Sequence, residues 1–164
     1  MAKNPKVLLI IPAYNEEKCI LNTVNKIKDY NKKNKTQFDI IVINDGSKDS
    51  TENILNDNSI NHIKLIQNLG IGGAVQTGYK YALINDYDIA VQYDGDGQHD
   101  VAYVRDLIQA LEKDKSDMAI GSRFIDGSSS SFKSTAARRV GIKIISGFIK
   151  LFTGHKVFDP TSGF

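Results

Sequence analysis

The fold of this chain is decided first by the apolar run Lys6-Val-Leu-Leu-Ile-Ile-Pro12. Consecutive apolar residues without polar alternation are typical of a strand that is buried on both faces of a parallel sheet. Pro12 is expected to end the strand, because proline has no N–H group to donate to a neighbouring strand. The sequence therefore predicts a buried first strand near the N-terminus.

Further apolar runs follow, and helical patterns separate them. Strands are predicted at Phe38–Asn44, His62–Ile66, Asp88–Tyr93 and Met118–Ser122. Helices are predicted after a cap at Asn15, after a cap at Asp49 or Ser50, from the glycine loop Asn68–Gly73 to about Ile84, over Val101–Glu112 and over Arg138–Phe152. This alternation predicts an α/β protein with a doubly wound, mostly parallel sheet, in a single domain over residues 1–164.

Composition narrows the class of protein. The chain has 164 residues, 41% hydrophobic and 24% charged, as in an ordinary soluble domain with a sizeable core. Its net charge of +2 does not favour nucleic acid as a partner. The single Cys19 cannot form an intrachain disulfide, and no run approaches the roughly 20 apolar residues of a spanning helix. We therefore expect a cytoplasmic protein.

The C-terminal part of the chain is basic. Residues 1–122 carry 14 Lys and Arg against 17 Asp and Glu, whereas residues 123–164 carry 7 against 2. In the last predicted helix, a polar stripe runs along one side of a largely apolar surface; its members are Arg139, Lys143, Ser146 and Lys150. Such a helix can lie on an anionic membrane surface. The alternative is a helix packed on the domain with its charges in solvent, and both remain open here.

The segment Asp94-Gly-Asp-Gly-Gln-His-Asp100 follows the fourth predicted strand. With Gly95 between them, Asp94 and Asp96 can turn tightly and direct both carboxylates at one divalent cation. Mg²⁺ and Mn²⁺ prefer oxygen ligands and usually share them with substrate phosphates. The alternative is an acidic surface turn, since Asp and Gly are common turn residues.

Turns after several strands strengthen the hypothesis of a ligand site. They are Ala13–Glu16, Asp45–Ser47, Asn68–Gly73 and Asp94–Asp100. In a parallel sheet all of them lie at one edge, where α/β proteins bind their ligands. We therefore expect these residues, which are far apart in sequence, to converge on one site.

Other ligand motifs are incomplete. Gly70 and Gly72 begin a dinucleotide-binding pattern, but Val75 occupies the third glycine position, and no P-loop is present. A calcium-binding EF-hand loop that began at Asp94 would need a glutamate at its twelfth position, where this chain has Arg105. The three histidines do not have the spacing of zinc ligands.

Six segments in register resemble glycosyltransferase family 2, and within it the polyprenol-phosphate sugar synthases. The segments are Ile11–Glu17, Asn44–Thr51, Asn68–Gly70, Asp94–His99, Gly121–Phe124 and Asp159–Phe164. The resemblance implies the GT-A fold and a nucleotide-diphosphate sugar as donor. It also implies that an Arg and further helical structure follow Phe164, so we expect the C-terminal part of the full fold to be missing.

The same resemblance implies roles for individual residues. Pro12, Tyr14 and Glu16 would hold the nucleoside, Asp45 its base or ribose, and Gly95 the nucleotide sugar. Asp94, Asp96 and Gln98 would ligate Mg²⁺ or Mn²⁺. Asp96 and Arg123 would act in catalysis, with Arg123 meeting phosphate charge, and Arg138 and Arg139 would bind the acceptor phosphate.

We therefore expect a metal-dependent, inverting transfer of a hexose to a polyprenyl phosphate at the inner membrane surface, or to a cell-surface glycan. A phosphate acceptor is already anionic and needs no general base, and Asp159 is the single candidate for such a base late in the chain. The synthases usually have Ser where this chain has Ile142. Glycosyltransferases that extend surface polysaccharides therefore remain a second hypothesis. A non-catalytic nucleotide-sugar-binding domain and a sugar nucleotidyltransferase are two further hypotheses.

Overall fold

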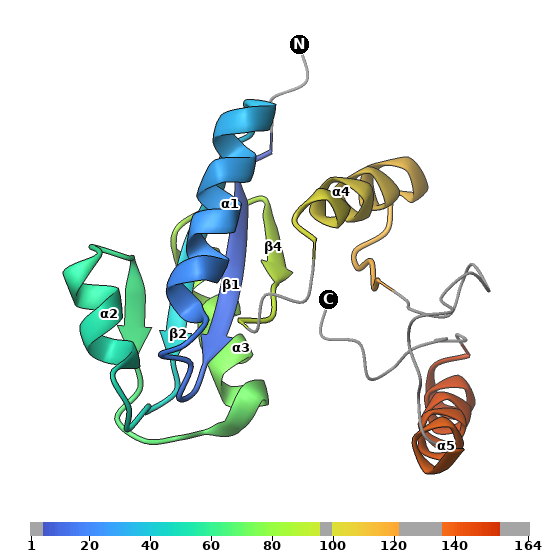
Figure 1. Ribbon diagram of the computed structural model, residues 1–164. Helices are drawn as coiled ribbons and strands as arrows, with labels where there is room; N and C mark the ends of the chain where they lie inside the picture. The colour runs from blue at the N-terminus through green and yellow to red at the C-terminus, as the bar shows by residue number, and fades with distance from the viewer. Residues whose placement is uncertain (1–4, 96–99, 122–135, 155–164) are drawn as a thin grey trace. The chain divides into compact units, whose positions relative to one another are not determined.

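The computed structural model describes residues 5–95, 100–121 and 136–154 (Figure 1). In chain order the elements are β1 (Val7–Ala13), α1 (Ile20–Asn34), β2 (Phe38–Asn44), α2 (Thr51–Asp57), β3 (His62–Lys64), α3 (Gly70–Ile84), β4 (Ile89–Gln92), α4 (Ala102–Asp114) and α5 (Ala136–Thr153). The chain forms two compact units, residues 1–108 and 109–164, and α4 begins in the first and ends in the second. A single domain over residues 1–164 stays a prediction.

The sheet lies in the first unit and has the strand order β3-β2-β1-β4. Every pair of neighbouring strands is parallel. The chain winds outward from β1 through β2 to β3 and then returns to place β4 on the other side of β1. This reversal beside β1 confirms the predicted doubly wound sheet, and ligands of such sheets bind where the winding direction changes.

Helices cover both faces of this sheet, with α1 and α3 on opposite sides (Figure 1). On the α3 side, a buried cluster joins the two central strands to the helix; it comprises Leu8, Ile10, Ile41, Ile43, Ala74 and Ala82. A Cβ added to Gly78 would lie 2.2 Å from the Cγ2 atom of Ile10. Glycine at this position therefore lets α3 approach β1 closely.

The predicted fifth strand is wrong over residues 118–121, which are described and form no β-strand. A strand needs a neighbour for its backbone and a buried face for its side chains, whereas Met118 and Ile120 are 74% and 41% exposed. The third strand is shorter than predicted, since it ends at Lys64, and Ile66 is fully exposed.

The predicted helix cap at Asn15 is also wrong. Helix α1 begins at Ile20, and its N-cap position is Cys19, four residues after Asn15. Asn15 itself has a left-handed backbone with φ of 57°. Short polar side chains can bond a nearby turn as readily as a helix terminus. At α2, Ser50 occupies the N-cap position without a side-chain bond, and Asp49 accepts the Thr51 N–H at 3.0 Å.

The last two predicted helices are confirmed to within two residues at each end. Across the described ranges of the chain, no helix is long and apolar enough to cross a bilayer. On α5, large apolar side chains are exposed; they are Ile144, Ile145, Phe148, Leu151 and Phe152.

Candidate functional site

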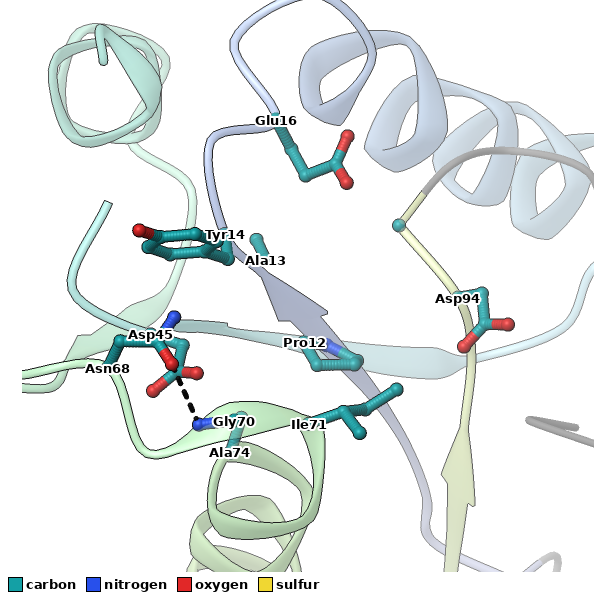
Figure 2. A pocket seen from close by; sticks show the side chains of 11 residues that line it. Pro12, Ala13, Tyr14, Glu16, Asp45, Asn68, Gly70, Ile71, Ala74 and Asp94 are labelled. Carbon is teal, nitrogen blue, oxygen red and sulfur yellow. Dashed lines mark hydrogen bonds between the residues drawn. The ribbon is translucent and has the colours of Figure 1, made fainter. Parts of the chain in front are cut away.

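A pocket of about 330 Å³ lies at the carboxyl edge of the sheet, within the first unit (Figure 2). Its lining comes from all of the strand-end turns identified in the sequence: Pro12, Ala13, Tyr14, Glu16, Asp45, Asn68, Gly70, Ile71, Ala74, Asp94 and Gly95. The predicted convergence is therefore confirmed. The volume is within the range of cavities that hold small-molecule ligands.

Asp45 forms one wall of this pocket and is almost completely buried, with 3% of its surface exposed. Its N–H donates to the Ala13 carbonyl at 2.8 Å, and its Oδ1 atom accepts the Leu69 N–H at 2.7 Å. The loop before α3 therefore holds the carboxylate in place. A carboxylate has about four lone-pair sites, so Asp45 keeps acceptor capacity for a ligand N–H or O–H.

The loop containing Asp45 lies close to the loop before α3. Gly46 has φ of 69°, and an added Cβ would lie 2.9 Å from the backbone of both Gln67 and Asn68. Asn68 in turn accepts the Gly70 N–H at 3.0 Å, drawn as a dashed line in Figure 2. At position 46, only glycine satisfies both the left-handed conformation and the close approach of Gln67 and Asn68.

An aromatic ring and two further carboxylates complete the pocket. Tyr14 is 43% exposed, and its ring lies on the same side of the pocket as Asp45 (Figure 2). Asp94 lies across Pro12 from Asp45, as expected from the position of β1 between β2 and β4. The Glu16 carboxylate accepts a hydrogen bond from the Cys19 thiol at 2.6 Å. The pocket thus offers a flat ring at one end and acidic groups along its length.

Hydrogen bonds join the turn after β1 to the turn after β2, and we call this set the inter-loop clamp. Its bonds are Asn15 N–H to Ser47 Oγ (3.0 Å), Lys48 N–H to Asn15 Oδ1 (2.8 Å), Glu16 N–H to Thr51 Oγ1 (2.9 Å), Glu17 N–H to Asp49 Oδ2 (3.1 Å) and Ser50 N–H to Glu17 Oε2 (2.9 Å). The clamp sets the separation between Tyr14 and Asp45. Sequence reasoning missed it, because Asn15 and Asp49 also fit local helix caps.

Asp49 is the most heavily bonded carboxylate of the clamp. Partial burial raises its pKa, but hydrogen bonds from the Thr51 hydroxyl (2.6 Å), the Thr51 N–H and the Glu17 N–H outweigh this effect. The net result is a pKa below the usual value of 3.8. Because the folded-state pKa is lowered, the ionised carboxylate stabilises the fold above pH 3.8, and this contribution is lost as the pH falls through the folded-state value.

We expect Asp49→Asn to lower the free energy of unfolding at pH 7 by about 1 kcal/mol, a value reduced by solvent screening of this partly exposed group. An amide cannot accept from all three donors, since one of its two polar atoms is an NH₂ group. Urea unfolding should show this difference at pH 7 and a smaller one at pH 3. Asp57→Asn, at the exposed end of α2, is the control. A difference that stays constant with pH would contradict the role of the ionised carboxylate.

The structure describes only part of the segment Asp94–Asp100, which we call the acidic motif. Asp94 and the buried Gly95 line the pocket, whereas Asp96, Gln98 and Arg123 lie outside the described residues. Arg138 and Arg139 belong to α5, in the second unit, but their side chains are not described. Within residues 5–95, 100–121 and 136–154, no three His, Cys, Asp or Glu side chains gather as a metal site. The carboxylate of Asp94 nevertheless has the donor chemistry that a hard divalent cation requires.

The family model described as "Glycosyl transferase family 2" matches residues 8–164. This chain belongs to glycosyl transferase family 2. The family assignment agrees with the resemblance of the six sequence segments, and the parallel sheet with its helices is the expected GT-A fold.

Similar proteins include several glycosyltransferases. This chain is 38% identical to UDP-N-acetylglucosamine–dolichyl-phosphate N-acetylglucosaminyltransferase of Methanococcus voltae. The match covers 96% of this chain and 67% of that protein. Glucosyl-3-phosphoglycerate synthase of Mycobacterium tuberculosis, solved with UDP, aligns with a TM-score of 0.62 at 19% identity, over 98% of this chain and 55% of the synthase. A second structure of that synthase, with Mn²⁺, UDP and phosphoglyceric acid, gives a TM-score of 0.52 at 23% identity, over 66% and 39% of the two chains. The chain thus spans about two thirds of the first relative and about half of the synthase.

Proposed function

We propose that this chain is the donor-binding and catalytic part of a metal-dependent, inverting glycosyltransferase. In this proposal, a hexose moves from a nucleotide-diphosphate sugar to a polyprenyl-phosphate acceptor. The observation that carries the proposal is one pocket lined by Tyr14, Asp45 and Asp94, each from a different strand-end turn. An aromatic ring, a buried acceptor and a metal-type carboxylate match the three parts of such a donor: base, nucleoside polar groups and diphosphate.

On the nucleoside side, the ring of Tyr14 would stack on the base. Asp45 would accept a hydrogen bond from a base N–H or a ribose hydroxyl, because its carboxylate is an acceptor held rigidly by the Leu69 N–H. Pro12 and Glu16 would line the ribose part of the site. The inter-loop clamp would keep these groups at a fixed separation, so that little freedom is lost when the nucleotide binds.

On the diphosphate side, Asp94, Asp96 and Gln98 would hold Mg²⁺ or Mn²⁺, which stabilises the negative charge that develops on the departing diphosphate. Gly95, between the two aspartates, lines the pocket and would meet the nucleotide sugar through its backbone. Arg123 would add a positive charge toward the phosphates. The donor chemistry of Asp94 supports this assignment, and the synthase crystallised with Mn²⁺ and UDP has the same fold.

For transfer, an oxygen of the acceptor phosphate would attack the anomeric carbon opposite the diphosphate. The bond between that carbon and the diphosphate oxygen breaks, and the configuration inverts. The acceptor is already anionic, so no residue needs to remove a proton. Arg138 and Arg139 would bind the acceptor phosphate near the cytoplasmic face of the membrane. The name of the Methanococcus voltae relative, which includes dolichyl phosphate, supports this acceptor class.

A thermal-shift screen of nucleoside diphosphates tests the proposal. In the presence of Mn²⁺, one nucleoside diphosphate at about 100 times its dissociation constant should stabilise the full-length protein by about 2.7 kcal/mol. This stabilisation raises the melting temperature by a few degrees. No stabilisation by any nucleoside diphosphate would exclude the donor site. Binding without turnover would instead favour a non-catalytic nucleotide-sugar-binding domain.

A further inference from the structure

Thr23 is a completely buried polar residue on the inner face of α1. Its neighbours on that face are the buried apolar residues Ile20, Val24 and Ile27. A buried hydroxyl requires a hydrogen-bond partner, and in a helix this partner is often the carbonyl one turn earlier. Here the hydroxyl of Thr23 leaves its own helix and donates to the carbonyl oxygen of Gly95 at 2.8 Å. The bond joins two residues that are 72 positions apart in the sequence.

Gly95 lies just beyond the end of the paired part of the sheet. The β1–β4 pairing runs as far as Ile10 and Gln92, and the Tyr93 N–H still donates to the Ile10 carbonyl at 2.9 Å. Gly95 itself is buried, and a Cβ added to it would lie 3.1 Å from the Pro12 carbonyl oxygen. A buried carbonyl at this point needs a donor from outside the sheet ladder, and Thr23 provides it.

We propose that Thr23 is a positioning residue for the acidic motif. The proposal rests on the proposed function, because the metal role of Asp94 and Asp96 belongs to it. The Gly95 carbonyl is part of the planar peptide unit that leads from Gly95 to the next residue of the chain. When the Thr23 hydroxyl holds this oxygen, it fixes the backbone immediately after Asp94. The direction in which the Asp94 carboxylate leaves the backbone therefore depends on α1 as well as on β4.

This support matters because metal sites depend on small displacements of their ligands. Ligand groups must be held to within about 0.5 Å, and outer groups that orient them commonly change metal affinity by about 10- to 100-fold. The Pro12 carbonyl leaves little room for a side chain at residue 95, but this spacing does not orient the Gly95 carbonyl. The Thr23 hydroxyl supplies this orientation through a directional bond from a rigid helix.

The test compares Thr23→Val, which removes the donor at nearly constant volume, with Thr23→Ser, which keeps the hydroxyl. Mn²⁺ affinity of the full-length protein is measured from the electron paramagnetic resonance signal of free Mn²⁺, and UDP affinity is measured without metal by calorimetry. We expect Thr23→Val to weaken Mn²⁺ binding by about tenfold and Thr23→Ser by less than about twofold, with metal-free UDP affinity unchanged. Thr23→Ala removes the same donor and replaces the valine variant if that variant does not fold.

Thr77→Val is the matched control. The Thr77 hydroxyl donates to the Gly73 carbonyl within α3 at 2.9 Å, so its loss removes a threonine bond without touching the acidic motif. Unchanged Mn²⁺ affinity in Thr23→Val, with only a lower melting temperature, would overturn the positioning role while the proposed function stands. Absence of Mn²⁺ binding in the unmodified protein would overturn both.

Discussion

Replacement of Asp94 by asparagine is expected to reduce turnover of the nucleotide-sugar donor by about 10²- to 10³-fold, the usual effect of losing one group that stabilises developing charge. Asn keeps the size of the side chain and one oxygen, so the fold around Pro12 and Gly95 should persist. What is lost is the negative charge that the proposed divalent-cation site requires. Release of nucleoside diphosphate by the full-length protein, measured over a series of Mn²⁺ concentrations, shows the effect as lower activity and a higher Mn²⁺ requirement.

Asp57→Asn serves as the control for Asp94→Asn, because it makes the same change at an exposed position on α2. It should leave both turnover and the Mn²⁺ requirement within about twofold of the unmodified protein, as expected for a surface substitution. If Asp94→Asn behaves like Asp57→Asn, Asp94 is not a metal ligand, and the acidic segment is a surface turn. Asp96→Ala provides the parallel test for the second aspartate of the motif.

Asp45→Asn is expected to raise the dissociation constant of the nucleoside diphosphate by about 10- to 100-fold, since an unmatched buried polar group costs about 1–3 kcal/mol. The amide oxygen can still accept the Leu69 N–H, which is 2.7 Å from Oδ1 of the native carboxylate. The NH₂ group must then face the pocket. A donor replaces an acceptor opposite the base or ribose, so the loss appears in binding rather than in folding. Calorimetric titration at saturating Mn²⁺ measures it.

Asp88→Asn is a matched control for Asp45→Asn. Asp88 also accepts a backbone N–H, from Lys6 at 2.7 Å, but it precedes β4 and therefore lies at the amino edge of the sheet. Its replacement should leave nucleotide affinity unchanged. Equal affinity in Asp45→Asn and Asp88→Asn, with both proteins folded, would show that Asp45 does not contact the nucleotide.

The candidate site could be predicted largely from the sequence, because its residues follow predicted strands. Tyr14, Asp45, Asn68 and Asp94 lie beyond four different apolar runs, and parallel pairing brings such positions to one edge. The prediction needed only the class of sheet, not its strand order. The metal ligands Asp96 and Gln98, the phosphate-binding Arg123 and the acceptor pair Arg138 and Arg139 stay predictions.

Other predictions failed where a local pattern fits more than one environment. The apolar residues at 118–121 suit a strand, but Met118 and Ile120 are exposed. Asn15 has the chemistry of a helix cap, yet its carboxamide accepts the Lys48 N–H in a neighbouring loop. Burial and hydrogen bonding at these positions depend on which elements lie nearby, and a local pattern does not contain that information.

The sequence by itself determined the strands β1 and β2, the parallel class of the sheet and the edge at which polar residues gather. The reason is that the pattern of apolar residues along a segment indicates how much of that segment is buried. The tertiary structure decided which groups meet there. It brings the Thr23 hydroxyl on α1 to the Gly95 carbonyl, and Asp49 to the Glu17 N–H. These bonds join residues 72 and 32 positions apart, so they form only when strand order and helix packing place the partners within hydrogen-bond distance.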